Sequence, residues 1–383
     1  MIAGISFLDS NQNSFPKNKT YKNYYLAIVS GIFLGISFPP FAGIFAFIAF
    51  IPFLLVLLEC ENFISSIKYG YAMMFSCGLV SMYWIGGFTH GRDSYLMLAG
   101  FLLLLAHPFF FTLPIATFVF LRNALHKKIA LFSFPFLWIT NEYFRAHTDF
   151  AFPWLTVGNT QTYNLSFIQI SSNIGVYGIS LLVLLINVII VYAVKKIIEL
   201  QWKIFSFQFA LCIFSVIVIF FIPIMIGNNI LSFYSENEKP VNPLRVAIVQ
   251  PNIDPWNKWQ NTIENQMDLL LKMSTEVLAF NPDVIVFPET AVPTYILSPK
   301  NEEYLEQLKA FVKKNKVALF TGIPEVRYYD DSTSAPANSK IFYDSRTRYE
   351  TFNSSMLLKP NTDSIQTYAK EILVPFAERV PYP

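Results

Sequence analysis

Long apolar runs in the first 230 residues constrain this chain more than any other feature. Seven such runs occur at about 24–38, 41–58, 69–88, 95–121, 129–144, 174–194 and 204–227. A helix needs roughly 20 apolar residues to cross the hydrocarbon core of a bilayer. The third, fourth, sixth and seventh runs meet that length, and the other three are short enough to be tilted, kinked or partly interfacial. We therefore predict a polytopic α-helical membrane domain of about seven helices.

The composition indicates a membrane part followed by a water-soluble part. Charged residues make up only 14% of the chain, well below the roughly 25% of a typical soluble domain. We predict an N-terminal tail at 1–23, a membrane domain at 24–227, a linker rich in Asn, Ser, Pro and Glu at 228–243, and a soluble domain at 244–383. The net charge of +2 comes with no basic stripe, so we expect no nucleic-acid partner.

The basic residues predict the orientation of the spans. If the N-terminus is cytoplasmic, the outer loops before residue 228 hold only Arg92 and Arg145. The cytoplasmic segments then hold Lys17, Lys19, Lys22, Lys68, Arg122, Lys127, Lys128, Lys195, Lys196 and Lys203. Because Lys and Arg concentrate in cytoplasmic connections, this orientation is the expected one. An odd number of spans then delivers the residues after Gly227 to the outer face of the membrane. The first run leads into further spans, so we expect an anchor and not a cleaved signal.

Two charged residues lie near the outer end of the fifth run, in "TNEYFRAHTDF". Glu142 and Arg145 are three residues apart and share one face of a helix. Charges at membrane depth face a cavity or one another, so we predict a structural membrane pair. An ion pair reaching to the membrane surface is the simpler alternative. His107 has no second ligand at helical spacing, and we expect it to be a packed helix residue.

The pattern changes after Leu244 to alternating strands and helices. "RVAIVQ", "DVIVFPE" and "VALFTGIPEV" are short apolar strand patterns, and the segments between them have helical spacing. "SKIFYDSRTRYETFNSSMLLKP" predicts a hairpin with a polar turn near Ser345–Arg348. This order predicts an α/β domain built on a sheet.

Two charged residues of this soluble domain are candidates for catalysis. Glu289 ends an apolar strand, and open α/β sheets bind ligands at the carboxyl ends of strands. A partly desolvated carboxylate there can act as a general base, although a helix-capping or loop-pairing role explains it equally well. Lys370 in "YAKEILVPF" could stabilise an oxyanion, although an ordinary surface lysine is the simpler interpretation. The spacing shows no nucleophile. We expect no metal and no cofactor, because no cysteine follows residue 230.

The motifs in combination are more specific. "RVAIVQPNI…KW", "DVIVFPET", "FNSSMLL" and "YAKEILVPFAERVP" resemble, in that order, the nitrilase-superfamily segments of apolipoprotein N-acyltransferases. The membrane motifs "NEYFR" and "FPWL" also fall where that family has them. The resemblance runs from the first span to residue 383. It implies a nitrilase-like αββα domain, incomplete at its C-terminus, on the periplasmic side of the bacterial inner membrane.

The resemblance also implies an activity and a role for each site residue. Members of this family transfer an acyl chain from a phospholipid to the N-terminal amine of a diacylglyceryl-cysteine lipoprotein, through a thioester. By motif, Glu289 is the base, Lys370 steadies the oxyanion, and Glu378 positions the lysine or the substrate amine. Trp259 resembles a tryptophan near the lipid entrance. The partners implied are a phospholipid donor, a diacylglyceryl apolipoprotein acceptor and the bilayer.

The resemblance implies a nucleophilic cysteine that residues 244–383 do not contain. Cys60, Cys77 and Cys212 lie in or beside apolar runs and are expected to be small packing residues. We therefore expect this chain to be a fragment that ends before the catalytic cysteine, and to be inactive by itself. The alternative is a non-catalytic, membrane-anchored scaffold that binds lipid or lipoprotein. A different membrane enzyme of the nitrilase type, such as an amidase, is a more distant possibility.

Overall fold

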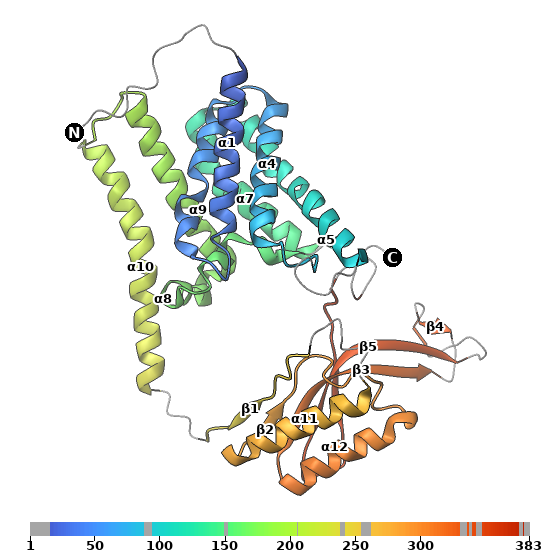
Figure 1. The fold of residues 1–383 in the computed structure, drawn as a ribbon. Coiled ribbons are helices and arrows are strands. Elements are labelled where there is room, and N and C mark those ends of the chain that lie inside the picture. Colours follow the sequence, from blue (N-terminus) through green and yellow to red (C-terminus); the bar gives the residue numbers. More distant parts are fainter. Residues whose placement is uncertain are drawn as a thin grey trace. The chain divides into compact units, whose positions relative to one another are not determined.

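The structure is a computed structural model, and it describes residues 16–87, 94–148, 152–204, 206–237, 242–253, 262–329, 335–336, 339–341, 347–374 and 378. The chain divides into two compact units, residues 1–238 and residues 239–379. We call the first the membrane unit and the second the sheet unit. The membrane unit is helical and the sheet unit is α/β, which confirms the predicted fold class (Figure 1).

Helices occupy each of the seven predicted apolar runs. The helices of the membrane unit are α1 Pro16–Gly35, α2 Ala46–Ala49, α3 Ile51–Glu59, α4 Phe63–Ser81, α5 Ser94–Ala106, α6 Thr112–Ala124, α7 Lys127–His147, α8 Leu165–Ile168, α9 Ser171–Ile198 and α10 Phe207–Asn237. Among the described residues, three helical stretches are long and apolar enough to cross a bilayer: Ser94–Ala124, Ser171–Ile198 and Phe207–Ser235. The protein is therefore a membrane protein, and the number of seven spans stays a prediction.

The ends of two helices differ from the predicted domain boundaries. The described part of α1 starts at Pro16, inside the predicted tail, and proline is accommodated in the first turn of a helix. α10 continues to Asn237, through most of the predicted linker. Polar residues such as Asn and Ser cost only tenths of a kcal/mol each in a helix that is already formed. The linker at 228–243 stays a prediction, and the structure adds that its first part is helical.

Close packing and buried polar contacts hold the membrane unit together. A Cβ added at Gly31 of α1 would lie 2.0 Å from the carbonyl oxygen of Met73 in α4, so this contact needs a glycine. Asn187 of α9 is fully buried between α2 and α3. Its Oδ1 accepts the N–H of Phe50 at 3.0 Å, and its Nδ2 donates to the carbonyl of Ala46 at 2.9 Å. Asn187 thus binds backbone groups at the break between these two helices.

A six-stranded mixed sheet forms the centre of the sheet unit (Figure 1). Its elements are β1 Val246–Ile248, α11 Ile263–Val277, β2 Val284–Val286, α12 Glu302–Asn315, β3 Ala318–Tyr329, β4 Lys340–Ile341, β5 Arg348–Leu358 and β6 Gln366–Ala369. The strand order is β1-β2-β3-β5-β4, with β6 also paired to β5. β1, β2 and β3 are parallel, as the alternation of strands and helices predicts, and the remaining pairs are antiparallel.

The predicted hairpin is present but short. β4 pairs with β5 at only two positions, and Arg348, predicted in the turn, is the first residue of β5. Residues 345 and 346 of that turn lie outside the described residues. The main partner of β5 is β3, with pairing along Leu319–Tyr329. Burial alternates along the second half of β5, where Ser354, Met356 and Leu358 are buried and the residues between them are half-buried.

The two faces of the sheet are different. Ile285 and Leu319 are paired neighbours and pack with Leu270 of α11 and Leu308 of α12 in one buried cluster. The next residues along each strand point to the opposite face, because side chains alternate. On that face Ile248 is 75% exposed and Phe320 is 40% exposed. Within the described residues, the helices therefore cover one face of the sheet, and we call the other the open face.

Candidate active site

The polypeptide turn after β2 positions Glu289. The N–H of Phe287 still pairs with the carbonyl of Phe320 at 2.8 Å, and the chain leaves the sheet at Pro288. Thr290 has a φ of +50°, so the turn is sharp. A Cβ at Gly322 of β3 would lie 2.7 Å from the Cα of Glu289 and 2.6 Å from the backbone N of Thr290. Gly322 therefore allows this turn to lie directly against the neighbouring strand.

The strand pairing of β5 and β6 positions Lys370. Lys370 follows β6, and its N–H donates to the carbonyl of Asn353 at 2.8 Å. In the same ladder Ser355 pairs with Tyr368, two residues away on each strand. Gly322 pairs with Ser355 on the other side. By the alternation of side chains, Asn353 and Lys370 lie on the open face with Ser355, Tyr368 and Phe320.

The structure brings Glu289, Lys370 and Glu378 together. The Nζ of Lys370 lies 3.8 Å from the Oε1 of Glu289. It lies 3.0 Å from the Oε1 and 2.9 Å from the Oε2 of Glu378. Glu378 is fixed in turn, because its Oε2 accepts the N–H of Val374 at 2.7 Å. Residues from three separate parts of the sheet unit thus meet at one cation, which lies between two carboxylates.

Asn353 is a member of this cluster that the motif analysis did not single out. Its Nδ2 donates to the Oε1 of Glu378 at 3.0 Å and also to the Oε1 of Glu289. It therefore links the two carboxylates through the same two oxygens, Oε1 of Glu289 and Oε1 of Glu378, that the Lys370 ammonium group contacts. The only signal in the sequence is the motif "FNSSMLL", which contains Asn353, but nothing in its spacing indicates a contact with Glu289.

A hollow of about 370 Å³ surrounds the cluster. Its lining residues are Phe287, Glu289, Phe320, Gly322, Asn353, Ser354, Ser355, Tyr368 and Lys370. Aromatic side chains thus form one part of the wall, and the charged groups stand at its edge. The side chain of Glu289 is 66% exposed, whereas those of Lys370 and Glu378 are 32% and 23% exposed. Glu289 is consequently the member of the cluster that an incoming group can reach.

The charges of Lys370 and Glu378 stabilise each other. The hydrogen bond to Glu378 raises the pKa of Lys370, against the opposite effect of desolvation. Desolvation alone raises the pKa of Glu378, but hydrogen bonds from the Val374 N–H, Lys370 and Asn353 hold that pKa below its ordinary value. At neutral pH the site therefore presents a fixed ammonium group held by a fixed carboxylate.

The other predicted residues lie elsewhere or outside the described residues. Trp259 falls in the segment 254–261, which lies outside them. Cys60 and Cys77 are buried in the membrane unit, and Cys212 is in α10. Among the described residues, no group of three or more His, Cys, Asp or Glu side chains could hold a metal ion.

Glu142 and Arg145 form a different cluster inside the membrane unit. The Oε1 of Glu142 accepts hydrogen bonds from the Trp138 indole at 3.2 Å and from the Val157 N–H at 2.8 Å. The Nη1 of Arg145 contacts the Nε2 of His107 at 3.1 Å and the carbonyl of Phe152 at 3.2 Å. Within the described residues no ion pair of 4.0 Å or less joins the two charges.

This arrangement differs from the predicted pair. Glu142 and Arg145 share a helix, but they are 0% and 6% exposed, so neither reaches the membrane surface. Each side chain turns to a nearer neighbour: Glu142 to the loop at Val157, and Arg145 to His107 in the 3₁₀-helix η3 His107–Phe111. His107 is buried, as expected, but it also takes part in this polar contact.

The fold and the site define a class of protein: a helical membrane domain followed by a domain of carbon–nitrogen hydrolase type. Two family models match the chain in that order. They are the apolipoprotein N-acyltransferase N-terminal domain, over residues 30–189, and the carbon-nitrogen hydrolase, over residues 245–383. The chain belongs to the apolipoprotein N-acyltransferase family of the nitrilase superfamily.

Similar proteins in other bacteria carry the same family name. The apolipoprotein N-acyltransferase of Chlorobaculum tepidum is 31% identical over 372 residues, which is 94% of this chain and 66% of that protein. The one of Geobacter metallireducens is 28% identical over 370 residues, 94% of this chain and 65% of that protein. The chain thus spans about two thirds of the length of the curated relatives it matches.

Proposed function

We propose that this protein takes part in the N-acylation of lipoproteins. The reaction transfers an acyl chain from a membrane phospholipid to the α-amino group of an N-terminal diacylglyceryl-cysteine. The observation that carries the proposal is the meeting of Glu289, Lys370 and Glu378 beside an open hollow that Glu289, Lys370 and aromatic side chains line. A base, a fixed cation and a group that holds the cation are what acyl transfer through a thioester requires in addition to a thiol nucleophile.

Each residue has a role in the proposed mechanism. Glu289 accepts the proton of a thiol, because a thiol near pKa 8.5 is mostly protonated at neutral pH. The thiolate attacks the ester carbonyl of the phospholipid, and Lys370 stabilises the negative oxygen that forms. The ester bond breaks, the proton passes from Glu289 to the leaving glycerol oxygen, and lysophospholipid departs. The lipoprotein amine then attacks the thioester, gives a proton to Glu289, and releases the thiolate, which takes that proton back.

Glu378 has a supporting role in this scheme. Both of its oxygens lie within 3.0 Å of the Lys370 ammonium group, which keeps that cation charged and fixed in position. Its link to Asn353 connects it to Glu289 as well. We assign Glu378 to the positioning of Lys370, since this is the contact that the structure supports best.

The thiol is the missing part of the proposed site. Residues 239–379 contain no cysteine, and Cys60 and Cys77 are packed in the core of the membrane unit. We propose that the nucleophile comes from residues other than 1–383, and that a polypeptide of these 383 residues alone does not turn over. We further propose, from the ten basic residues on one side of the predicted spans, that the sheet unit lies on the periplasmic side of the inner membrane.

A second candidate function is a binding scaffold. The absence of a cysteine from residues 239–379 favours it, because binding of lipid or lipoprotein needs the hollow but no nucleophile. In this version Glu289 and Lys370 recognise the polar end of the acceptor, and no covalent step occurs.

An acyl-transfer assay separates the two candidates. The complete reading frame, including everything after codon 383, is purified and incubated with phospholipid and a synthetic diacylglyceryl-cysteine peptide. Mass spectrometry then measures the N-acylated peptide and the lysophospholipid. We expect the two products in equal amounts, and none from residues 1–383 alone.

Three outcomes would change the proposal. Turnover by residues 1–383 alone would contradict the need for an outside thiol. Binding of the peptide without any product from the complete frame would favour the scaffold. If neither binding nor turnover is observed, both candidate functions are wrong.

A further inference from the structure

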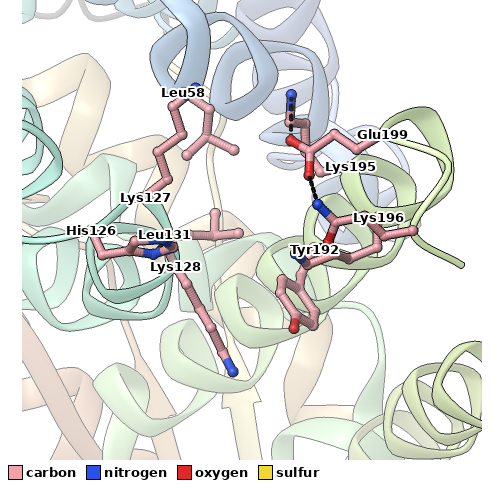
Figure 2. A pocket seen from close by; sticks show the side chains of 10 residues that line it. Leu58, His126, Lys127, Lys128, Leu131, Tyr192, Lys195, Lys196 and Glu199 are labelled. Atoms are coloured by element: carbon pink, nitrogen blue, oxygen red, sulfur yellow. Dashed lines mark hydrogen bonds and ion pairs between the residues drawn. The ribbon is translucent and has the colours of Figure 1, made fainter.

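A second pocket lies in the membrane unit, at one end of its helices. It has a volume of about 200 Å³ and lies between the end of α3, the beginning of α7 and the end of α9. Figure 2 shows Lys127 and Lys128 of α7 on one side, and Lys195 and Lys196 of α9 on the other. The proposed acyl transfer makes no use of this pocket, because its site lies in the sheet unit.

The charges of the pocket are not balanced. Glu59 at the end of α3 contacts Lys127 at 3.3 Å and Lys195 at 2.6 Å, and Glu199 contacts Lys195 at 3.4 Å. The two carboxylates therefore contact only two of the four lysines that line the pocket. Within the described residues, no carboxylate contacts Lys128 or Lys196. The pocket keeps an excess of two positive charges, which favours an anion.

Lys128 and Lys196 gather around one aromatic ring. The Nζ of Lys128 lies 5.4 Å and that of Lys196 5.8 Å from the ring centre of Tyr192. The ring attracts each cation, and the Nζ of Lys196 also donates a hydrogen bond to the Oε1 of Gln201 in the pocket wall. The beginning of α7 adds the positive end of a helix dipole, with His126 as the residue before the helix. A phosphate group in the pocket would balance the excess positive charge.

The surroundings of the pocket are apolar. Leu58 and Leu131, which line it, are buried. Close by in the sequence, Ile129, Ile198 and Leu200 are 51%, 63% and 91% exposed. Aliphatic side chains of this kind next to a basic cluster suit a molecule with both a phosphate and acyl chains. A soluble anion would use only the lysines.

We propose that this pocket binds the phosphate of an anionic phospholipid, with Lys128 and Lys196 as its main contacts. Basic pockets between membrane helices are suited to such headgroups. The lipid would act as a structural ligand at this end of the bundle, separate from the acyl donor of the proposed reaction.

The test measures which lipid stays with the protein. Residues 1–383 are placed in nanodiscs of equal phosphatidylglycerol and phosphatidylcholine, released from them, and examined by native mass spectrometry. We expect one retained phosphatidylglycerol. Lys128→Gln with Lys196→Gln should lower its retention by about 10- to 30-fold, since each basic residue near a lipid surface adds roughly a factor of five.

A matched control removes the same charge elsewhere. Lys19→Gln with Lys22→Gln removes two exposed lysines of α1 that do not line the pocket, and should change retention less than twofold. Lys128→Arg with Lys196→Arg keeps both charges and should retain the lipid, which separates a lost contact from a misfolded variant. Inorganic phosphate at 10 mM, used alone as a competitor, should not displace the lipid.

Several results would overturn the proposal. Equal loss in the α1 control would mean a general surface attraction. Displacement by inorganic phosphate would mean that the ligand is a soluble anion. Equal retention of phosphatidylglycerol and phosphatidylcholine would show that the pocket does not select an anionic lipid. None of these results depends on acyl transfer.

Discussion

The protein contains two clusters of charged residues, and their surroundings are opposite. Glu142 and Arg145 are buried in the membrane unit, and the Nε and Nη2 of Arg145 have no hydrogen-bond partner among the described residues. Glu289, Lys370 and Glu378 lie at an open hollow, joined to one another and to Asn353. Buried polar groups are costly to leave unpaired, whereas exposed ones can be changed at little cost to stability.

This comparison suggests a division of roles. The side chains of Glu142 and Arg145 contribute mainly to the stability of the helices around them. The side chains of Glu289, Lys370 and Glu378 contribute mainly to the reaction and little to stability, because water already surrounds much of Glu289. Four variants test this division, from the largest expected effect to the smallest.

The largest effect is expected at Glu289. In the complete reading frame, Glu289→Gln should lower the rate of acyl transfer by about 1,000-fold, because the amide cannot accept the proton of the thiol. The melting temperature should stay the same, since Glu289 is 66% exposed. Glu306→Gln on α12 is the control and should change neither quantity. If Glu289→Gln keeps the unchanged rate of acyl transfer, Glu289 is not the base of the proposed mechanism.

A substitution at Glu142 should instead act mainly on stability. Glu142→Ala leaves the Trp138 indole and the Val157 N–H without their acceptor, at a cost of about 1–3 kcal/mol for each buried group. We expect a loss of about 3 kcal/mol or more, measured by unfolding in detergent. Glu59→Ala, which removes a 47% exposed carboxylate, should cost less than about 1 kcal/mol. Equal losses in both variants would contradict the division.

A substitution at Gly322 should lower both the stability of the protein and its rate of acyl transfer. A Cβ at this position forces the turn at Glu289 and Thr290 away from β3, so Gly322→Ala should cost about 1–3 kcal/mol of stability. A displaced base should also lower acyl transfer by about 100-fold. Unfolding and rate measurements on the same preparation test this, and a fully active variant would show that the turn can shift freely.

The smallest effect is the dependence on pH at Glu378. Its pKa is held below the ordinary value of 4.5, so its carboxylate stabilises the fold above that pH. The contribution is lost as the pH falls through the lowered pKa. Glu378→Gln should therefore be less stable than the unchanged protein at pH 7, by less than about 1 kcal/mol, and the gap should close below about pH 4.5. Thermal melts at several pH values measure the difference in stability between the two proteins. A difference that does not change with pH would contradict the predicted loss of the Glu378 contribution in acid.

The motifs predicted the class of fold and three members of the site. Glu289 ends an apolar strand and Lys370 precedes an apolar stretch, and both patterns can be read from the sequence. Asn353 and Gly322 are not predictable in this way, because their importance comes from the register of β3, β5 and β6, which brings residues far apart in the chain to one place. The same holds for the contact of Glu142 with Val157, which depends on how the loop at 156–158 folds back onto α7, whereas Trp138 lies one helical turn away on α7 itself.

The open face of the sheet has a practical consequence for anyone who isolates residues 239–379. Ile248 of β1 and Phe320 of β3 stand exposed on this face, and Val286 of β2 and Leu357 of β5 have the same orientation. In plain buffer such a preparation would self-associate and bind environment-sensitive dyes. Because Phe320 also lines the hollow that contains Lys370, fragment screens against it would return apolar hits beside the lysine that make no use of its charge, unless detergent or lipid is supplied from the first purification step.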